Sequence, residues 1–306
     1  MVDFSKIIFG GNVFGWTVDE QQSKQLLSYA FEKGISSIDT SDMYQTWVPG
    51  HKGGESETII GKWLKENPLK RDQVQIITKV GAPLSTDKKG LSKQYIKQAI
   101  EDSLQRLNTE YVDAYLSHYP DPACPIEETL RAYEELLNEG KVRHIGASNH
   151  TPDELEAAII TAQDKGLPAY EIYQPGYNLA DRSNYEENYL ALCQKYRLKV
   201  ITYYSLAAGF LSGKYRSLDE IEHSKRKGML QKYFTPEGLN ILKTLDQMTE
   251  KYQATHSELS LSWLLDQPSI LAPIASATTL QQIDALAKAA SIKLSAEDLE
   301  LLNQLK

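Results

Sequence analysis

The sequence predicts an α/β protein of the (β/α)8 (TIM) barrel class with an additional C-terminal helix. Short runs rich in Val, Ile and Tyr alternate with helical patterns along the chain, and we count eight such runs. The 306 residues fit the size of one such barrel. Because no Gly/Ser-rich linker or change in composition interrupts the pattern, we expect a single domain over residues 1–306.

The candidate strands are short and apolar, and a helical pattern follows each of them. Several read as continuous apolar runs, which is typical of strands that are buried on both faces. In chain order they are Ile7–Gly11, Ser37–Thr40, Val74–Val80, Val112–His118, Val142–Ser148, Ala169–Gln174, Lys199–Tyr204 and Ser269–Ile274.

Helix ends are marked by glycine and helix starts by capping sequences. The helical patterns Asp19–Lys33, Ile126–Glu139 and Pro152–Lys165 are each followed directly by a glycine, which favours the left-handed conformation that ends a helix. Thr17–Glu20 and Thr151–Glu154 both have the form of a capping box. Helix, turn and strand therefore succeed one another at these points.

Two further segments depart from the regular repeat. The long gap between the seventh and eighth strands contains an insertion around Leu206–Phe234. Ser295–Lys306 has the pattern of an extra helix after the eighth unit. Both are compatible with the barrel, which tolerates long loops between its strands.

Charge and composition exclude several classes of partner. With 33 Lys and Arg against 41 Asp and Glu, the chain has a net charge of −8, so we expect neither nucleic acid nor a membrane surface as a partner. No apolar stretch reaches membrane-spanning length, and the N-terminus has no signal-peptide pattern. The two cysteines are far apart and are interpreted as packing residues, so a cytoplasmic location is expected.

Polar side chains stand at the carboxyl ends of six consecutive candidate strands. In this barrel class the active site is built at that end, so the six side chains are expected at one rim. They are Asp39, Lys79, His118, Ser148 with Asn149, Gln174 and Tyr203.

Four of the candidate residues form a plausible proton-donating group. A lysine cation near a phenol lowers the pKa of the phenol, which would make Tyr44 an acid–base group supported by Lys79. Asp39 would hold the lysine charged, and a neutral His118 would bond to a carbonyl oxygen. Each residue also has an ordinary interpretation: Asp39 as a helix cap, Lys79 reaching water, His118 in the core and Tyr44 packing on the barrel mouth.

Rival chemistries lack their sequence motifs. There is no H-E-x-x-H, no G-x-S-x-G, no complete phosphate-binding P-loop and no G-x-G-x-x-G, and only His118 among the six histidines ends a strand at the rim. We therefore expect no metal site. A dinucleotide would have to bind across the barrel mouth.

Longer stretches of the sequence resemble a known family. They are GISSIDTSDMY (34–44), GGESETIIGKWL (53–64), IITKVG (76–81), VDAYLSHYPDP (112–122), GKVRHIGASNH (140–150), YEIYQPGYNL (170–179), FLSGKY (210–215) and LSWLLDQPSILAPIASATTLQQI (261–283). In this order and spacing they resemble the aldo-keto reductases over nearly the whole chain. The resemblance is to the bacterial branch related to the potassium-channel β-subunits.

The resemblance implies a function and a set of residues. It implies reduction of an aldehyde or ketone to an alcohol by hydride transfer from NADPH, with Tyr44 as proton donor and Asp39, Lys79 and His118 completing a catalytic tetrad. The implied cofactor-binding residues are Gly11, Asn12, Ser148, Asn149, Gln174, Tyr203, Leu206, Ala207, Gly209, Lys214, Ser276, Thr278 and Gln282. An aromatic substrate pocket is expected from Val13, Phe14, Trp47 and Tyr119, with residues 45–54 folded over it.

Two segments depart from the family pattern. Tyr204-Ser205-Leu206 stands where the family usually has Ser-Pro-Leu after the aromatic residue. Residues 276–286, where the family usually places a cation for the 2′-phosphate, contain no Lys or Arg, so NADH remains open beside NADPH. A cation from the insertion, Lys225, Arg226 or Lys227, could replace it.

Two alternative functions remain open. Lys79 could form a Schiff base in an aldolase, although Asp39 would oppose this by keeping the amine protonated. The chain could also be a regulatory or sensor subunit that binds cofactor and turns over slowly.

Overall fold

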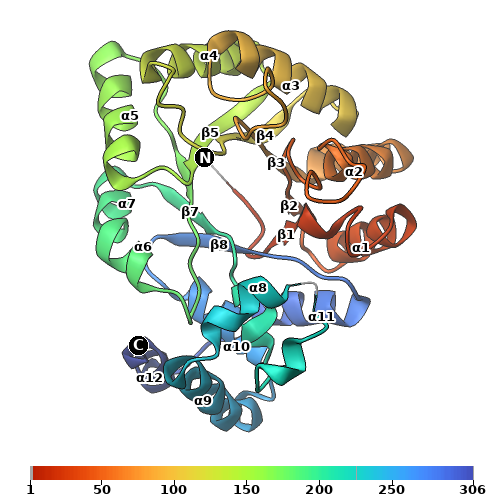
Figure 1. Cartoon of the computed structure of the whole chain (residues 1–306), viewed down its shortest axis with the longest axis vertical. Coiled ribbons are helices and arrows are strands. Elements are labelled where there is room, and N and C mark those ends of the chain that lie inside the picture. The colour runs from red at the N-terminus through yellow and green to blue at the C-terminus, as the bar shows by residue number, and fades with distance from the viewer. Residues whose placement is uncertain (1–2, 225, 306) are drawn as a thin grey trace.

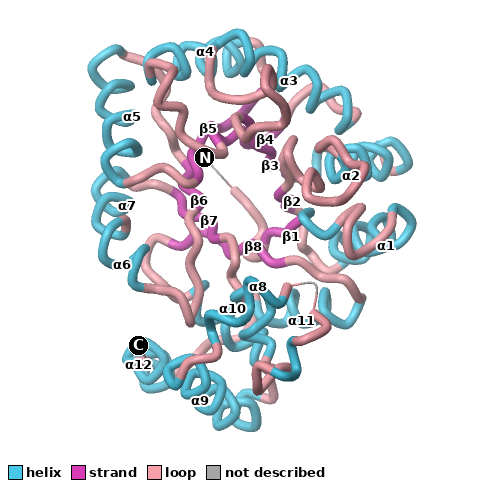
Figure 2. Tube along the Cα trace, viewed as in Figure 1, coloured by secondary structure: helices cyan, strands magenta, loops and turns pink. Residues whose placement is uncertain are grey.

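The computed structural model describes residues 3–224 and 226–305 and consists of eight parallel strands closed into a barrel in chain order. Helices surround the strands on the outside, as Figures 1 and 2 show. The strands are β1 (Ile8–Gly10), β2 (Ser37–Asp39), β3 (Gln75–Val80), β4 (Val112–Ser117), β5 (Val142–Ser148), β6 (Ile172–Gln174), β7 (Lys199–Thr202) and β8 (Ile270–Ala275). The predicted (β/α)8 architecture is confirmed, and the strand positions agree with the sequence to within three residues at each end.

The α-helices follow the strands in the expected alternation. They are α1 (Glu20–Glu32), α2 (Glu55–Glu66), α3 (Lys93–Leu107), α4 (Ile126–Asn138), α5 (Pro152–Lys165), α6 (Ser183–Asn188), α7 (Leu190–Tyr196), α8 (Lys227–Leu230), α9 (Pro236–Tyr252), α10 (His256–Leu265), α11 (Leu280–Ala289) and α12 (Ala296–Gln304). Short 3-10 helices are η1 (Gly11–Val13), η2 (Pro68–Gln73), η3 (Ala207–Ser212), η4 (Asp219–Ile221) and η5 (Gln231–Tyr233).

One of the two predicted capping boxes forms. At α5 the Thr151 hydroxyl accepts from the Glu154 amide at 3.3 Å, and the Glu154 carboxylate accepts from the Thr151 amide at 2.8 Å. At α1 the prediction is wrong: Asp19 is the N-cap and accepts from the Gln22 amide at 2.8 Å, while the Thr17 hydroxyl is buried without a hydrogen-bond partner. A carboxylate two residues closer to the helix satisfies the free amides better than the threonine can.

The insertion and the C-terminal helix lie outside the regular barrel. The predicted insertion holds η3, η4, α8 and η5, and α8 contacts η3. Helix α12 lies beside α9 at the lower edge of Figure 1, where Asp298 accepts hydrogen bonds from Lys251 at 2.6 Å and from Tyr252. No helix of the described residues is long and apolar enough to cross a membrane.

Apolar side chains fill two separate layers. The larger layer lies between the strands and the surrounding helices. The smaller lies inside the barrel and consists of Ile8, Ile77, Ala114, Leu116, Ile172, Ile201, Ala272 and Ile274, with Phe4 and Leu271 packed against it. Since side chains alternate between the two faces of a strand, the residue two positions beyond each of these also points inward. This alternation positions the site.

Candidate active site

Polar side chains form the next inward-facing layer, at the carboxyl end of the barrel. Lys79 stands two residues beyond Ile77, and His118 two residues beyond Leu116. Gln174 and Tyr203 follow the inward-facing residues of β6 and β7 in the same way. The apolar interior of the barrel therefore ends in a polar layer that lies on its axis.

Asp39, Lys79 and Tyr44 form the centre of this layer. The Lys79 ammonium donates to both carboxylate oxygens of Asp39, at 2.7 and 2.8 Å, and to the Thr40 carbonyl at 2.7 Å. The Tyr44 hydroxyl lies 3.1 Å from the Lys79 nitrogen and donates to Asp39 at 3.1 Å. The Gln174 amide also donates to Asp39, at 2.9 Å. Every polar group at this centre is thus paired inside the protein, and Lys79 has no exposed surface.

The acidity of Tyr44 differs from the sequence prediction. Burial raises the pKa of Tyr44 well above its usual value, and the neighbouring Asp39 charge raises it further. The expectation that Lys79 lowers this pKa is therefore wrong, because burial and the Asp39 charge outweigh the contact with the lysine. Burial also lowers the pKa of the Lys79 ammonium, against the contacts with Asp39. Tyr44 is consequently a neutral phenol with a proton to give.

His118 lies beside Tyr44 and is uncharged. The ring centroids of Tyr44 and His118 are 6.3 Å apart. Burial and the nearby Lys79 charge lower the pKa of His118 well below its usual value, which agrees with the predicted neutral imidazole. Its Nδ1 lies 3.1 Å from the hydroxyl of Ser41. The Tyr119 ring stacks on the imidazole at 4.9 Å and helps to hold its plane.

The residues expected to bind a carboxamide are joined to each other. The Ser148 hydroxyl donates to the Gln174 carbonyl at 2.8 Å. The Asn149 amide donates to the His118 carbonyl at 2.9 Å, and the Tyr203 hydroxyl donates to Asn149 at 2.9 Å. Asn149 adopts a left-handed backbone conformation, with φ of 57°. The Asn149 amide also donates to the Ser148 hydroxyl at 3.2 Å, so the side chains of Tyr203, Asn149 and Ser148 are linked, and Gln174 joins them through its main-chain carbonyl.

The four predicted pocket residues fall into two groups. Trp47 and Tyr119 are exposed, and they contact the Tyr44 and His118 rings respectively. Val13 and Phe14 have no exposed surface and belong to the hydrophobic core, so their side chains offer no surface to a ligand in this structure. The segment 45–54 carries Trp47 to the rim beside Tyr44.

Three further aromatic or basic residues lie at the rim. The sequence predicted no role for two of them, Trp16 and Tyr204, and gave Arg226 only as one of three alternative cations. The Trp16 ring meets Trp47 edge to face at 5.9 Å, and Tyr204 is half exposed beside Tyr203 at 5.2 Å. The guanidinium of Arg226 lies 5.7 Å from the Trp16 ring centroid. Only the clustering of aromatic residues after strand ends could have indicated Trp16 and Tyr204.

The residues expected at a pyrophosphate lie in one irregular turn. Leu206 is the N-cap of η3, and Ala207 and Gly209 within it have φ of 51° and 106°. A side chain added at Gly209 would meet no atom within 4 Å, so the backbone is open there. The ammonium of Lys214 is exposed and lies 4.7 Å from the Tyr215 ring centroid.

The segment after β8 is held by its own polar groups. The Ser276 hydroxyl donates to the Asn12 side chain. Asn12 follows Gly11 in η1, directly after β1, so this bond joins the segment after β8 to the segment after β1. The Gln282 side-chain oxygen accepts from the Thr278 amide at 2.7 Å. Thr278 and Gln282 are therefore adjacent, whereas Ser276 pairs with Asn12, and Gln282 is exposed.

Of the two described cations among the three candidates at 225–227, Arg226 has no acidic partner among the described residues. Its guanidinium is largely buried, bonds only weakly to the Ala208 carbonyl at 3.5 Å, and forms no ion pair with a described residue. Burial lowers its pKa from the usual value. Lys227, by contrast, pairs with Glu222 at 2.6 Å. Lys225 lies outside the described residues.

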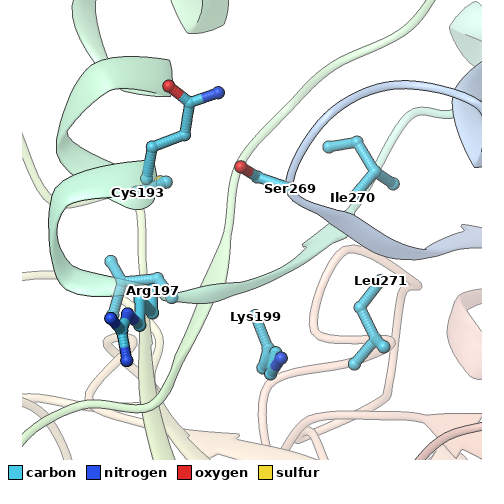
Figure 3. A pocket seen from close by; sticks show the side chains of 8 residues that line it. Cys193, Arg197, Lys199, Ser269, Ile270 and Leu271 are labelled. Atoms are coloured by element: carbon cyan, nitrogen blue, oxygen red, sulfur yellow. The ribbon is translucent and has the colours of Figure 1, made fainter.

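Two surface cavities lie away from this centre. A cavity of about 360 Å³ at the amino ends of β7 and β8 is lined by Arg197, Lys199 and Ser269, among others (Figure 3). A cavity of about 510 Å³ lies between the segment 15–20 and α2, and it includes Trp16. The first cavity contains none of the predicted site residues and opens at the opposite end of the barrel.

Comparison with known proteins finds sequences that are similar over nearly the whole chain. The pattern of the family described as "Aldo/keto reductase family" matches residues 6–306. A putative voltage-gated potassium channel subunit beta of Schizosaccharomyces pombe is 33% identical, covering 94% of this chain and 85% of its own. Aldo-keto reductase YhdN of Bacillus subtilis is 33% identical, with 96% and 86% covered. L-glyceraldehyde 3-phosphate reductase of Escherichia coli O157:H7 is 28% identical, with 95% and 85% covered.

Proposed function

Because the chain belongs to the aldo/keto reductase family, we propose that it is an oxidoreductase that reduces an aldehyde or ketone to an alcohol, with NADPH as the preferred cofactor and Tyr44 as the proton donor. The observation that carries the proposal is the buried contact of Tyr44 with both Lys79 and Asp39. A neutral phenol beside a buried cation suits proton donation to an oxygen that is gaining negative charge.

The rim residues fit a nicotinamide cofactor. Ser148, Asn149 and Gln174 supply amide and hydroxyl groups that suit a carboxamide, and the Tyr203 ring stands beside them as a stacking surface. When bound, the cofactor supplies a hydride to the carbonyl carbon. The open backbone at Gly209 offers space for phosphate groups, and Arg226, which has no ion pair with a described residue, offers charge.

Each residue of the centre has a defined role in this proposal. His118, being neutral, donates a hydrogen bond that orients the substrate oxygen next to the Tyr44 hydroxyl. Tyr44 gives its proton to that oxygen, since an alkoxide is a much stronger base than a phenolate. Lys79 then stabilises the phenolate, and Asp39 holds Lys79 in place at 2.7 Å. The exposed Trp47 and Tyr119 offer an aromatic wall for the rest of the substrate.

The same contacts disfavour the Schiff-base alternative. A lysine that attacks a carbonyl needs a free amine and access to the substrate. Lys79 has no exposed surface and donates to Asp39 and to the Thr40 carbonyl at 2.7 Å each. These contacts favour its supporting Tyr44 over its acting as a nucleophile.

The preference for NADPH rests on Arg226. Residues 276–286 contain no Lys or Arg, so a 2′-phosphate needs a cation from elsewhere. A largely buried guanidinium without a carboxylate partner retains its capacity for bidentate binding of a phosphate. We therefore assign the phosphate contact to Arg226 rather than to the paired Lys227.

The proposal is tested by following cofactor absorbance at 340 nm with a panel of aldehydes and ketones, in parallel with NADPH and NADH. We expect consumption of NADPH with at least one carbonyl substrate and slower consumption of NADH. Tight cofactor binding without turnover of any carbonyl would instead favour the sensor or regulatory role.

A further inference from the structure

Asp42 is a buried acid next to the centre that the proposed reaction does not use. It follows Ser41 in the turn after β2, and only 2% of its surface is exposed. One carboxyl oxygen lies 3.2 Å from the Ser41 hydroxyl, and the other has no hydrogen-bond partner among the described residues. Because a buried carboxylate without a bonded cation is unfavourable, the neutral acid is the preferred form.

Burial dominates the acidity of Asp42, and the charges around it act in both directions. The titratable groups that face it come from α2, α3, β3, β4 and α4. They are Glu57, Tyr95, Arg106, Lys79, Tyr115 and Tyr133. Burial and the like charge of Glu57 raise the pKa of Asp42 to about 8, although Arg106 opposes them. Arg106 is itself engaged by Glu57 at 2.7 Å, which limits its effect on Asp42.

Ser41 connects Asp42 to the imidazole. Its hydroxyl oxygen accepts from the Met43 amide at 3.2 Å and also lies 3.1 Å from Nδ1 of His118. A hydroxyl has one proton and two acceptor sites, and the Met43 amide occupies one of the acceptor sites. Ser41 can therefore donate to Asp42 or to His118, but not to both. Whichever of the two does not accept must donate to Ser41.

The two arrangements give His118 opposite tautomers. When Asp42 is neutral, its proton is satisfied only on Oδ1, which faces Ser41, because Oδ2 has no hydrogen-bond partner among the described residues. Asp42 then donates to Ser41, Ser41 donates to Nδ1, and the ring proton stands on Nε2. An ionised Asp42 accepts from Ser41, so Nδ1–H donates to Ser41 and Nε2 carries only a lone pair. Only the first tautomer can donate a hydrogen bond from Nε2 to a carbonyl oxygen.

We propose that Asp42 is a positioning residue, which acts through Ser41 to keep the proton of His118 on Nε2. Asp42 touches neither substrate nor cofactor in this account. The catalytic consequence rests on the role proposed above for His118. The tautomer itself does not depend on that role, because it follows from the bonds among Asp42, Ser41 and His118.

The first test is the 15N NMR spectrum of protein labelled at histidine, with the His118 signals identified by their loss in His118→Gln. At pH 6.5 we expect the Nε2–H tautomer in the wild type. As the pH rises through about 8, the population should shift toward Nδ1–H. Asp42→Asn, whose amide can donate to Ser41 but cannot ionise, should keep Nε2–H throughout.

Ser41→Ala removes the link without changing a charge. In this variant the His118 tautomer should no longer respond to pH between 7 and 9.5. The proposal is overturned if the wild type carries Nδ1–H at pH 6.5, if its tautomer is constant up to pH 9.5, or if Ser41→Ala titrates like the wild type.

The second test is the pH profile of kcat for carbonyl reduction. A group with a pKa near 8 is about one tenth protonated at pH 9, so wild-type kcat should fall about 10-fold between pH 7 and 9. The fall in Asp42→Asn should stay within about 2-fold. An equal fall of kcat in both proteins would overturn the proposal for Asp42. The absence of any turnover would contradict the proposed function, and the NMR test of the His118 tautomer would still apply.

Discussion

The two halves of the proposed active site are built differently. At the catalytic half, strand residues pair with one another at short distances, and the buried Asp39–Lys79 pair has almost no exposed surface. At the phosphate half, the candidate residues stand on the insertion and on the segment after β8. Among the described residues, the Arg226 guanidinium in the insertion makes one weak hydrogen bond, and Gln282 after β8 is exposed. We infer that the catalytic half is preorganised and that the phosphate half is completed by the ligand.

The largest effect that this contrast predicts concerns Tyr44. Tyr44→Phe should lower kcat by about 10²- to 10⁴-fold, because it removes the proton donor and keeps the ring. Cofactor affinity, measured by fluorescence titration, should stay within about 2-fold of the wild type. Tyr196→Phe makes the same change on α7, outside the site, and serves as the matched control. Near-normal kcat in Tyr44→Phe would show that another group gives the proton.

This half of the site could be predicted from the sequence for a physical reason. Strand residues alternate strictly, so apolar runs that end in Lys79, His118 or Gln174 already fix which side chains face the axis. The sign of the Tyr44 pKa could not be predicted, because it depends on the balance of burial, Asp39 and Lys79 in space. The burial of Val13 and Phe14 likewise depends on packing against Phe9 and its neighbours.

The second prediction concerns the stability of the preorganised half. Lys79→Met should lower the free energy of unfolding by about 3–5 kcal/mol, since it leaves the Asp39 carboxylate buried without its cation. The double variant Asp39→Asn, Lys79→Met should recover part of this loss, because no charge then remains to be compensated. Urea unfolding of both proteins measures the difference. A loss below about 1 kcal/mol in Lys79→Met would contradict the buried pair.

The third prediction concerns the phosphate half. Arg226→Gln should weaken NADPH by about 10- to 100-fold, the size of a charge-assisted contact, and NADH by less than about 3-fold. Lys227→Gln, next to it in the chain but paired with Glu222, is the matched control and should change neither dissociation constant appreciably. Equal weakening of both cofactors would assign Arg226 to the pyrophosphate instead of the 2′-phosphate.

The role of Arg226 lay beyond prediction from sequence. The three neighbouring cations at 225–227 look equivalent in the chain, and only the fold of the insertion distinguishes Arg226 from Lys227. Arg226 turns toward Ala208 and Trp16, whereas Lys227 pairs with Glu222. Irregular loops have no period that fixes which side chain points inward, in contrast to the strands.

The smallest predicted effect concerns the segment after β8. Gln282→Arg should tighten NADPH by about 5- to 10-fold, or roughly 1 kcal/mol, because the new guanidinium would be exposed and screened by solvent. NADH should change little. Gln281→Arg adds the same charge one position earlier on α11 and should give a smaller gain. If Gln282→Arg leaves NADPH affinity unchanged, the 2′-phosphate does not lie against this segment.

The most direct test of the central claim follows the hydrogen that is transferred. The protein is mixed with NADPH that carries deuterium at the transferred position of nicotinamide C4, together with a carbonyl substrate from the panel, and the product is analysed by mass spectrometry and NMR. We predict an alcohol with one deuterium on the former carbonyl carbon, formed far more slowly by Tyr44→Phe at saturating cofactor. An alcohol without deuterium, or the same rate in Tyr44→Phe, would contradict the account.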